Sequence, residues 1–225
     1  MNAPDLVLFD LDHTLLQGDS DQLWCDFLVQ QSVVEAEPLL SRNRAMATGY
    51  RNGTVDVLSF CEFYLGTLRL MDAMAWQPLR LRFAQQWVIP RLASAAVAQL
   101  RAHQQAGHQV LITTATNRFI TELTAAHLGV SELIATEAEC IDNRFTGRVF
   151  QTPNMREGKV VRLHEWLQRQ GQALSQWHST AYSDSINDLP LLEAVNHAVC
   201  AQPDPDRKST RLNSSHEWIS RMPSS

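Results

Sequence analysis

Short apolar runs alternate with amphipathic stretches along most of this chain. The runs at residues 6–10, 109–114, 133–141, 180–183 and 198–200 are bounded by turn-forming residues and predict buried strands. Helical periods lie between them at residues 92–106, 120–128 and 159–170, and a glycine follows each one. Residues 142–147 predict a turn into a hairpin strand that ends near Phe150. This alternation predicts an α/β fold with a doubly wound parallel sheet.

Residues 17–88 break the alternation. Their apolar positions follow a helical period at residues 20–31, 34–46, 55–65 and 78–87, and Asp19 and Asp56 are suited to be N-caps. We therefore expect an all-helical domain, residues 17–88, inserted into a core made of residues 1–16 and 89–206. Ligands bind at the carboxyl ends of the strands in such sheets, so an insertion after the first strand is expected to cover the site as a lid.

The last stretch of the chain differs in composition. From Lys208 onward it holds six serines in eighteen residues and has no clear hydrophobic period. Residues 207–225 therefore predict a disordered or non-native tail, which carries no functional argument.

Composition excludes several classes of protein. A net charge of −5 over 225 residues, without a basic stripe, argues against nucleic-acid binding. The four cysteines are far apart, which favours reduced packing residues over a disulfide framework or a zinc site. No run approaches the length of a membrane span, and no basic leader precedes the first strand, so we expect a cytoplasmic protein that does not contact membranes.

Two acidic clusters follow predicted strands. Asp10 and Asp12 come directly after the first strand, and Asp184 and Asp188 follow the strand at residues 180–183. Each cluster alone is compatible with an ordinary acidic turn. If the two strand ends meet, however, the carboxylates repel one another unless a hard cation such as Mg²⁺ lies among them. One carboxylate could then act as a nucleophile and its neighbour as a proton shuttle.

Two further residues suit an anionic ligand. Thr114 lies at the end of a predicted strand, where its hydroxyl could donate to a phosphate oxygen, although threonine is also a common strand residue. Lys159 begins a predicted helix, and it is one of only two lysines among 19 basic residues, the other being Lys208. A lysine at a helix N-terminus adds positive charge where backbone N–H groups already favour an anion.

These motifs, in this order, resemble the haloacid dehalogenase superfamily, in its phosphoserine-phosphatase-like branch with a helical cap (subfamily I, C1 cap). The resemblance covers residues 5–206 and implies a Rossmann-like core. It implies that Asp10 is the nucleophile, Asp12 the general acid and base, and that Mg²⁺ binds to Asp10, the Asp12 carbonyl and Asp184. By the same resemblance Thr114 and Lys159 hold the phosphoryl oxygens, Thr14 steadies the loop, Asp188 orients Lys159 or metal-bound water, and Asn187 contacts the phosphate or braces the loop.

The insertion bears on the substrate. In this branch an acid and an arginine of the cap grip an amino-acid substrate, and here Asp19 and Glu62 fall at those places, with Arg51 or Arg69 as substitutes for the arginine. Two acids favour an amine-bearing phosphomonoester without a carboxylate, such as phosphoethanolamine, phosphocholine or histidinol phosphate. Aromatic residues could face that cation, although core packing is the alternative for them: Trp24, Phe60, Phe63 and Tyr64.

Other activities stay open. A phosphoserine phosphatase, a phosphotransferase and a catalytically silent ligand-binding protein are the alternatives to a hydrolase of amine-bearing phosphates. A phosphonatase would need a lysine in the insertion, and residues 17–88 contain none. The expected partner is a small phosphomonoester, and the expected state is a monomer or homodimer.

Overall fold

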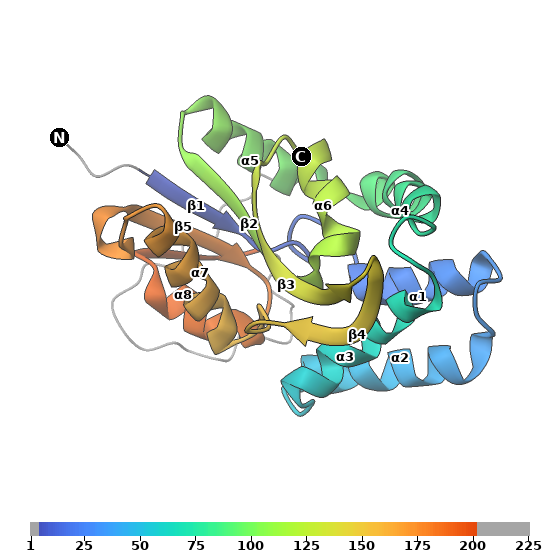
Figure 1. The fold of residues 1–225 in the computed structure, drawn as a ribbon. Helices are drawn as coiled ribbons and strands as arrows, with labels where there is room; N and C mark the ends of the chain where they lie inside the picture. Colours follow the sequence, from blue (N-terminus) through green and yellow to red (C-terminus); the bar gives the residue numbers. More distant parts are fainter. Residues whose placement is uncertain (1–4, 202–225) are drawn as a thin grey trace.

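The computed structural model describes residues 5–201. Its centre is a six-stranded sheet in the order β4-β3-β2-β1-β5-β6 (Figure 1). The strands are β1 (Asp5–Phe9), β2 (Gln109–Asn117), β3 (Glu132–Ile141), β4 (Arg144–Phe150), β5 (His178–Ser183) and β6 (His197–Cys200). All pair in parallel except β4, which is antiparallel to β3. The predicted α/β fold is confirmed.

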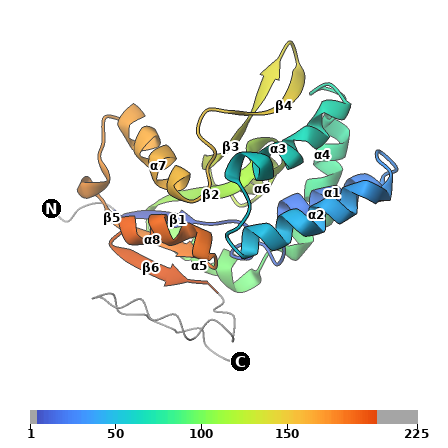
Figure 2. The ribbon, with the colours of Figure 1, turned by 90° about the horizontal axis from the view of Figure 1, so that it is seen from below.

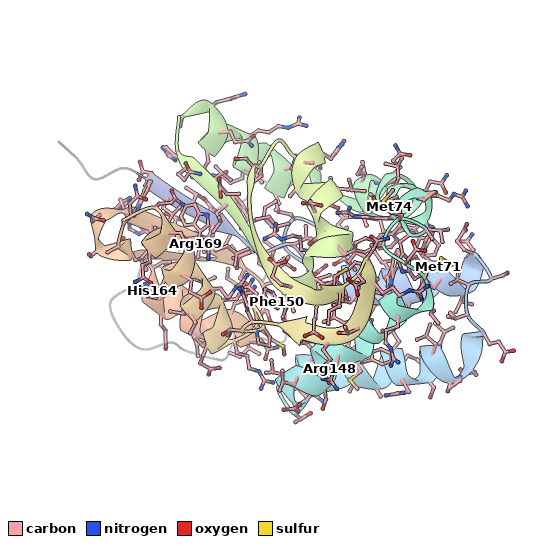
Figure 3. All side chains as sticks on the ribbon, viewed as in Figure 1. Met71, Met74, Arg148, Phe150, His164 and Arg169 are labelled. Carbon is pink, nitrogen blue, oxygen red and sulfur yellow. The ribbon has the colours of Figure 1, made fainter. Side chains whose placement is uncertain are left out.

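Helices cover both faces of this sheet. Alternate side chains of a strand point to opposite faces of the sheet. In β1, Val7 and Phe9 point to one face and pack in a cluster with α5 (Ser94–Gln105) and α6 (Arg118–His127). Leu6 and Leu8 pack on the other face against α7 (Glu157–Arg169) and α8 (Leu189–Ala194). On the outer side of α7, His164 and Arg169 are exposed, as Figure 3 shows.

The chain between β1 and α5 is helical. It forms α1 (Ser20–Gln30), α2 (Ala36–Arg51), α3 (Val57–Thr67) and α4 (Gln77–Phe83), and a π-helical turn, Ala84–Val88, extends α4. Asp19 and Asp56 cap α1 and α3, as predicted, by accepting from the backbone N–H of Gln22 and Ser59. Helix α2 runs to Arg51, beyond the predicted end at residue 46. Figures 1 and 2 show this helical group beyond the carboxyl ends of the parallel strands.

The inserted helices belong to two hydrophobic clusters. One cluster is continuous with the core that covers β1 and β2. It contains Trp24 and Phe27 of α1, Trp76 just before α4, and Phe83 at the end of α4. Helix α3 takes part in both clusters: its Leu65 belongs to this core, while its Phe60 packs in a second cluster that includes Cys25 of α1 and Met155. Helix α3 also lies against β4, so apolar packing fixes α1, α3 and α4 to the sheet, whereas α2 packs on the other inserted helices.

The predicted hairpin is present. Asp142 and Asn143 form its turn with φ of 48° and 63°, a left-handed conformation that Asn and Asp tolerate. The turn contacts the insertion, because the backbone N–H of Ala73 donates to the carbonyl of Asn143 at 2.9 Å. Figure 3 labels Met71 and Met74 on this part of the insertion, and Arg148 and Phe150 on β4.

Two sequence predictions concern chain ends and membranes. The predicted tail, residues 207–225, lies outside the described residues. Between Asp5 and Ala201, no helix has the length and apolar character needed to cross a membrane.

Candidate active site

A cavity of about 250 Å³ lies where β1, β2 and β5 end beneath the inserted helices. It receives side chains from the turns after β1 and β5, from the end of β2, and from α1, α2 and α3. The lining residues are Asp10, Asp12, His13, Asp19, Asp21, Gln22, Ala47, Tyr50, Arg51, Phe60, Ala115, Thr116, Asp184 and Ser185. Four of the predicted site residues, Asp10, Asp12, Asp19 and Asp184, thus share one cavity.

A buried ion triad lies behind the cavity. Lys159 Nζ is 2.7 Å from Asp10 Oδ1 and 2.6 Å from Asp188 Oδ2, and the lysine is only 1% exposed. Burial lowers the pKa of Lys159, but the charges of Asp10 and Asp188 outweigh it and hold that pKa above its usual value. The ammonium therefore stays charged, with one carboxylate facing the cavity and the other anchored by Ser183 Oγ at 2.7 Å.

Local backbone geometry brings Lys159 to this place. A Cβ on Gly158 would lie 2.0 Å from the carbonyl oxygen of Pro153, so only glycine allows the loop before α7 to approach so closely. Arg156, at the start of that turn, adopts φ 54° and ψ −126°, a conformation that costs energy for any residue with a side chain. The sequence pair Gly158-Lys159 thus has a steric basis.

Asp12 is held by several donors. Its Oδ1 accepts from the backbone N–H of Ser20 at 2.6 Å, and its Oδ2 lies 3.0 Å from Thr116 Oγ1 and 3.3 Å from Thr114 Oγ1. Burial and the nearby Asp19 carboxylate raise the pKa of Asp12 to about 6, although the hydrogen bonds from Ser20 and Thr116 oppose the rise. A carboxyl with such a pKa can exchange a proton near neutral pH.

Thr114 is fully buried and does not line the cavity. Its hydroxyl contacts Asp12 and accepts from the backbone N–H of Thr116 at 3.2 Å. Asn154, which sequence reasoning missed, braces this end of β2 by donating from Nδ2 to the carbonyls of Thr114 and Ile134 at 2.9 and 3.0 Å. Thr14 likewise lies behind the cavity, donating to Asp10 Oδ2 at 3.3 Å and accepting from the backbone N–H of Asp184 at 3.2 Å.

The acidic side chains at the strand ends suit a hard cation. Burial raises the pKa of Asp184, and burial with the neighbouring carboxylates raises that of Asp10 despite Lys159. Within the described chain, however, no three or more His, Cys, Asp or Glu side chains converge on a metal position. In the donor set that the family resemblance implied, Asp10 and Asp184 contribute carboxylates and Asp12 its backbone carbonyl. Two carboxylates and a carbonyl are oxygen ligands of the kind Mg²⁺ binds.

Asn187 and Arg156 connect the core to the insertion. Asn187 Nδ2 donates to the carbonyl of Tyr50 at 2.8 Å. Arg156 donates from Nε to Asn187 Oδ1 at 3.2 Å and from Nη2 to the carbonyl of Val55 at 3.3 Å. Of the two roles expected for Asn187, bracing the loop is the one for which the structure has contacts. Sequence reasoning did not find Arg156, because its partners, the Asn187 side chain and the Val55 carbonyl, are far away in the chain.

The position predicted for Glu62 needs correction. Glu62 is exposed on α3 and does not line the cavity, because the helix buries Phe60, Cys61, Tyr64 and Leu65 on its other side. Arg51, at the end of α2, lines the cavity mouth instead. Arg69 packs its side chain near Gly147 of β4.

Among the aromatic residues considered for a cation pocket, only Phe60 lines the cavity. Trp24 packs in the main core and donates from Nε1 to Thr67 Oγ1 at 3.0 Å, and Tyr64 donates to Asn43 Oδ1 at 3.0 Å. Arg42 lies over the Phe63 ring at 5.3 Å. Tyr50, which sequence reasoning missed, stacks on Phe60 with ring centroids 5.0 Å apart and completes an aromatic wall.

Most of the chain matches one hydrolase family. A model of the haloacid dehalogenase-like hydrolase family matches residues 7–193. The chain belongs to this family. A relative from Neisseria meningitidis serogroup C (strain 8013), named histidinol-phosphatase, is 34% identical over 202 residues, covering 89% of this chain and 91% of the relative.

Two solved structures share the fold of this chain. A Bordetella pertussis Tohama I protein described as of unknown function is 40% identical, with a TM-score of 0.85, and the match covers 91% of this chain and 93% of that one. A phosphoserine phosphatase solved as a phospho-aspartyl intermediate analogue has a TM-score of 0.63 at 16% identity, covering 88% and 87% of the two chains. The second likeness establishes the shared fold.

Proposed function

We propose that this family member is a Mg²⁺-dependent phosphomonoester hydrolase with Asp10 as its nucleophile. The observation that carries the proposal is the triad: Asp10 faces the cavity while its Oδ1 lies 2.7 Å from the buried Lys159 ammonium. That contact holds the carboxylate in one orientation. It also puts a permanent positive charge beside the place where a phosphoryl group would be attacked. The phosphatase named among the relatives supports the same reaction class.

The proposed chemistry takes two steps at the same phosphorus atom. An oxygen of Asp10 attacks phosphorus, and the bond from phosphorus to the alcohol oxygen breaks as Asp12 donates its proton to that oxygen. In the second step Asp12 removes a proton from water, the water oxygen bonds to phosphorus, and the bond between phosphorus and Asp10 breaks. The pKa of Asp12, raised to about 6 mainly by burial, suits a group that must both give and take a proton.

The other core residues position these two. Lys159 would neutralise phosphoryl oxygens, Asp188 and Thr14 would hold Lys159 and Asp10, and Thr114 would hold Asp12 or a phosphoryl oxygen. Asp10, Asp184 and the Asp12 carbonyl would hold Mg²⁺, which when bound supplies further positive charge to the phosphoryl group. The inserted helices, residues 17–88, would act as the cap over this site.

We propose that the leaving group is an amine-bearing alcohol without a carboxylate. The leading candidate for the substrate is histidinol phosphate. Asp19 lines the cavity on the insertion side, and the stacked rings of Tyr50 and Phe60 lie in the same lining. The relative named histidinol-phosphatase supports this choice. Arg51 at the cavity mouth favours the second candidate, phosphoserine, since a guanidinium can bind a carboxylate.

The test is phosphate release in Mg²⁺ from histidinol phosphate, phosphoethanolamine, phosphocholine, phosphoserine and p-nitrophenyl phosphate. We expect turnover that falls by at least about 10³-fold in Asp10→Asn, because the nucleophile is lost. Addition of glycerol to the assay separates hydrolysis from phosphotransfer. Transfer of the phosphoryl group to glycerol would lower the amount of free phosphate relative to the amount of alcohol released. Folded wild-type protein that releases phosphate from none of these substrates would contradict the proposal.

A further inference from the structure

Asp21, the second residue of α1, is a buried acid with an incomplete set of partners. It is 3% exposed and lines the cavity beside Asp19. Its Oδ2 lies 3.0 Å from Thr116 Oγ1, whereas its buried Oδ1 has no hydrogen-bond partner. Within the described chain no lysine, arginine or histidine forms an ion pair with it.

The surroundings of Asp21 make this arrangement costly. Burial and the charges of Asp19 and Asp12 all raise the pKa of Asp21. The Thr116 hydroxyl cannot satisfy it alone, because Thr116 has one proton and also lies 3.0 Å from Asp12 Oδ2. A buried carboxylate without a cationic partner is strongly unfavourable. A ligand that carries a positive charge and N–H donors would supply the missing partner.

Asp21 is better suited than Asp19 to recognise such a charge. Asp19 Oδ1 already accepts from the backbone N–H of Gln22 as the cap of α1, and the residue is partly exposed, so water competes for it. Asp21 offers an unused oxygen in a position shielded from water, where a charge-assisted hydrogen bond is stronger. The rings of Tyr50 and Phe60 in the same cavity can accept the remaining face of a cation.

We infer that Asp21 is a specificity-determining residue that binds a protonated amine of the leaving group through its unpartnered Oδ1. This inference rests on the proposed phosphomonoester hydrolysis and extends it, because it assigns the recognition of the amine to a residue outside the acidic motifs at the strand ends. Substrates whose leaving group carries an ammonium are selected over uncharged ones of the same size.

The test compares two matched substrates, 2-aminoethyl phosphate and n-propyl phosphate, which differ by an ammonium in place of a methyl group. Wild-type protein is expected to prefer the amine by at least about 10-fold in kcat/KM. Asp21→Asn keeps the shape and the contact with Thr116 but removes the charge. It is expected to lower kcat/KM for the amine by about 10- to 100-fold, chiefly through KM, and for n-propyl phosphate by no more than about 3-fold.

Asp26→Asn is the matched control, since Asp26 is an exposed acid on the same helix. This control variant is expected to leave kcat/KM unchanged for both substrates. If Asp21→Asn fails to fold, inhibition of the wild-type protein tests the inference. Ethanolamine is expected to inhibit the hydrolysis of p-nitrophenyl phosphate at least about 10-fold more strongly than n-propanol. Equal inhibition by the two alcohols would overturn the inference.

The outcomes separate the inference from the proposed function. If wild-type protein hydrolyses p-nitrophenyl phosphate but Asp21→Asn lowers kcat/KM equally for both alkyl phosphates, Asp21 is only a structural partner of Thr116 and the inference fails alone. If the wild type hydrolyses neither the alkyl phosphates nor p-nitrophenyl phosphate, the proposed function fails and the inference fails with it.

Discussion

Asn187 donates from Nδ2 to the backbone carbonyl of Tyr50 at 2.8 Å, which joins the turn after β5 to the last turn of α2. The Tyr50 ring lines the cavity, so this hydrogen bond fixes one wall of the site to the element that carries Asp184. Arg156 extends the connection to Asn187 and to the Val55 carbonyl. Helix α2, which packs on the other inserted helices, is thus joined to the core by polar contacts next to the site.

Removal of the Arg156 side chain is expected to loosen this connection. Arg156→Ala deletes two hydrogen bonds worth about 1 kcal/mol each, so backbone amides of residues 49–57 should exchange faster with deuterium, and KM should rise more than kcat falls. Arg169→Ala, an exposed change on the same helical segment (Figure 3), is the control and should leave exchange and kinetics unchanged. Unaltered exchange at residues 49–57 in Arg156→Ala would rule out a link of this kind.

Loss of the Lys159 charge is expected to destabilise the fold. Lys159→Met leaves Asp10 and Asp188 buried without their cation, so the free energy of unfolding should fall by about 3–5 kcal/mol. Asp188→Asn introduced into Lys159→Met removes one of the unpaired charges and should restore part of the loss. Denaturant unfolding of the four proteins of this cycle measures both effects.

The surface supplies a control for that cycle. Arg44 and Glu37 form an ion pair at 3.2 Å in which both side chains are more than half exposed. Arg44→Met should change the free energy of unfolding by no more than about 0.5 kcal/mol, because water screens such pairs. A similar small change for Lys159→Met would show that the buried triad does not contribute as its geometry indicates.

Mg²⁺ is expected to stabilise the protein through Asp184. A bound ion stabilises the native state by an amount that reaches about 2.7 kcal/mol at a hundredfold excess over Kd, so Tm should rise with Mg²⁺ concentration. Asp184→Asn should abolish that rise, and Asp142→Asn, in the exposed hairpin turn, should keep it. Thermal unfolding with and without Mg²⁺ measures this directly, and an equal rise in Asp184→Asn would place the cation elsewhere.

The sequence predicts those parts of the fold and the site that depend on local patterns, and it misses those that depend on contacts between residues far apart in the chain. Asp10, Asp12 and Asp184 adjoin strand ends, and a parallel sheet brings its strand ends together, so their convergence could be predicted from the apolar pattern. The same holds for the fold and for the hairpin at Asp142, where local pattern and turn chemistry are sufficient. Lys159 and Asp188 form an ion pair although they lie far apart in the chain, and only the family resemblance, not a local pattern, suggested that Asp188 orients Lys159.

The insertion was harder to predict because helices carry no comparable marker of register. The sequence predicts Glu62 in the pocket, yet one residue of helix rotates a side chain by about 100°, and Glu62 faces solvent. The longer extent of α2 brings Tyr50 and Arg51 to the cavity instead. Asp21 depends on its contact with Thr116, and Arg156 on its contacts with the Asn187 side chain and the Val55 carbonyl. No local pattern in the sequence encodes these distant contacts.

The burial of Asp12 is expected to appear in the pH dependence of stability. Its pKa is about 6 in the folded protein, raised mainly by burial and by Asp19, against an ordinary value of 3.8. The folded state therefore binds the proton more tightly than the unfolded state, and the free energy of unfolding contributed by this group falls as pH rises through 6.

In Asp12→Asn the carboxyl is replaced by an amide, which does not titrate in this pH range. In chelator, we expect the stability of Asp12→Asn relative to wild type to increase by about 1 kcal/mol between pH 5 and pH 7. Denaturant unfolding of both proteins at several pH values measures this difference. A difference for Asp12→Asn that stays flat or shrinks toward pH 7 would mean that Asp12 is not held at the raised pKa that its proton-shuttling role requires.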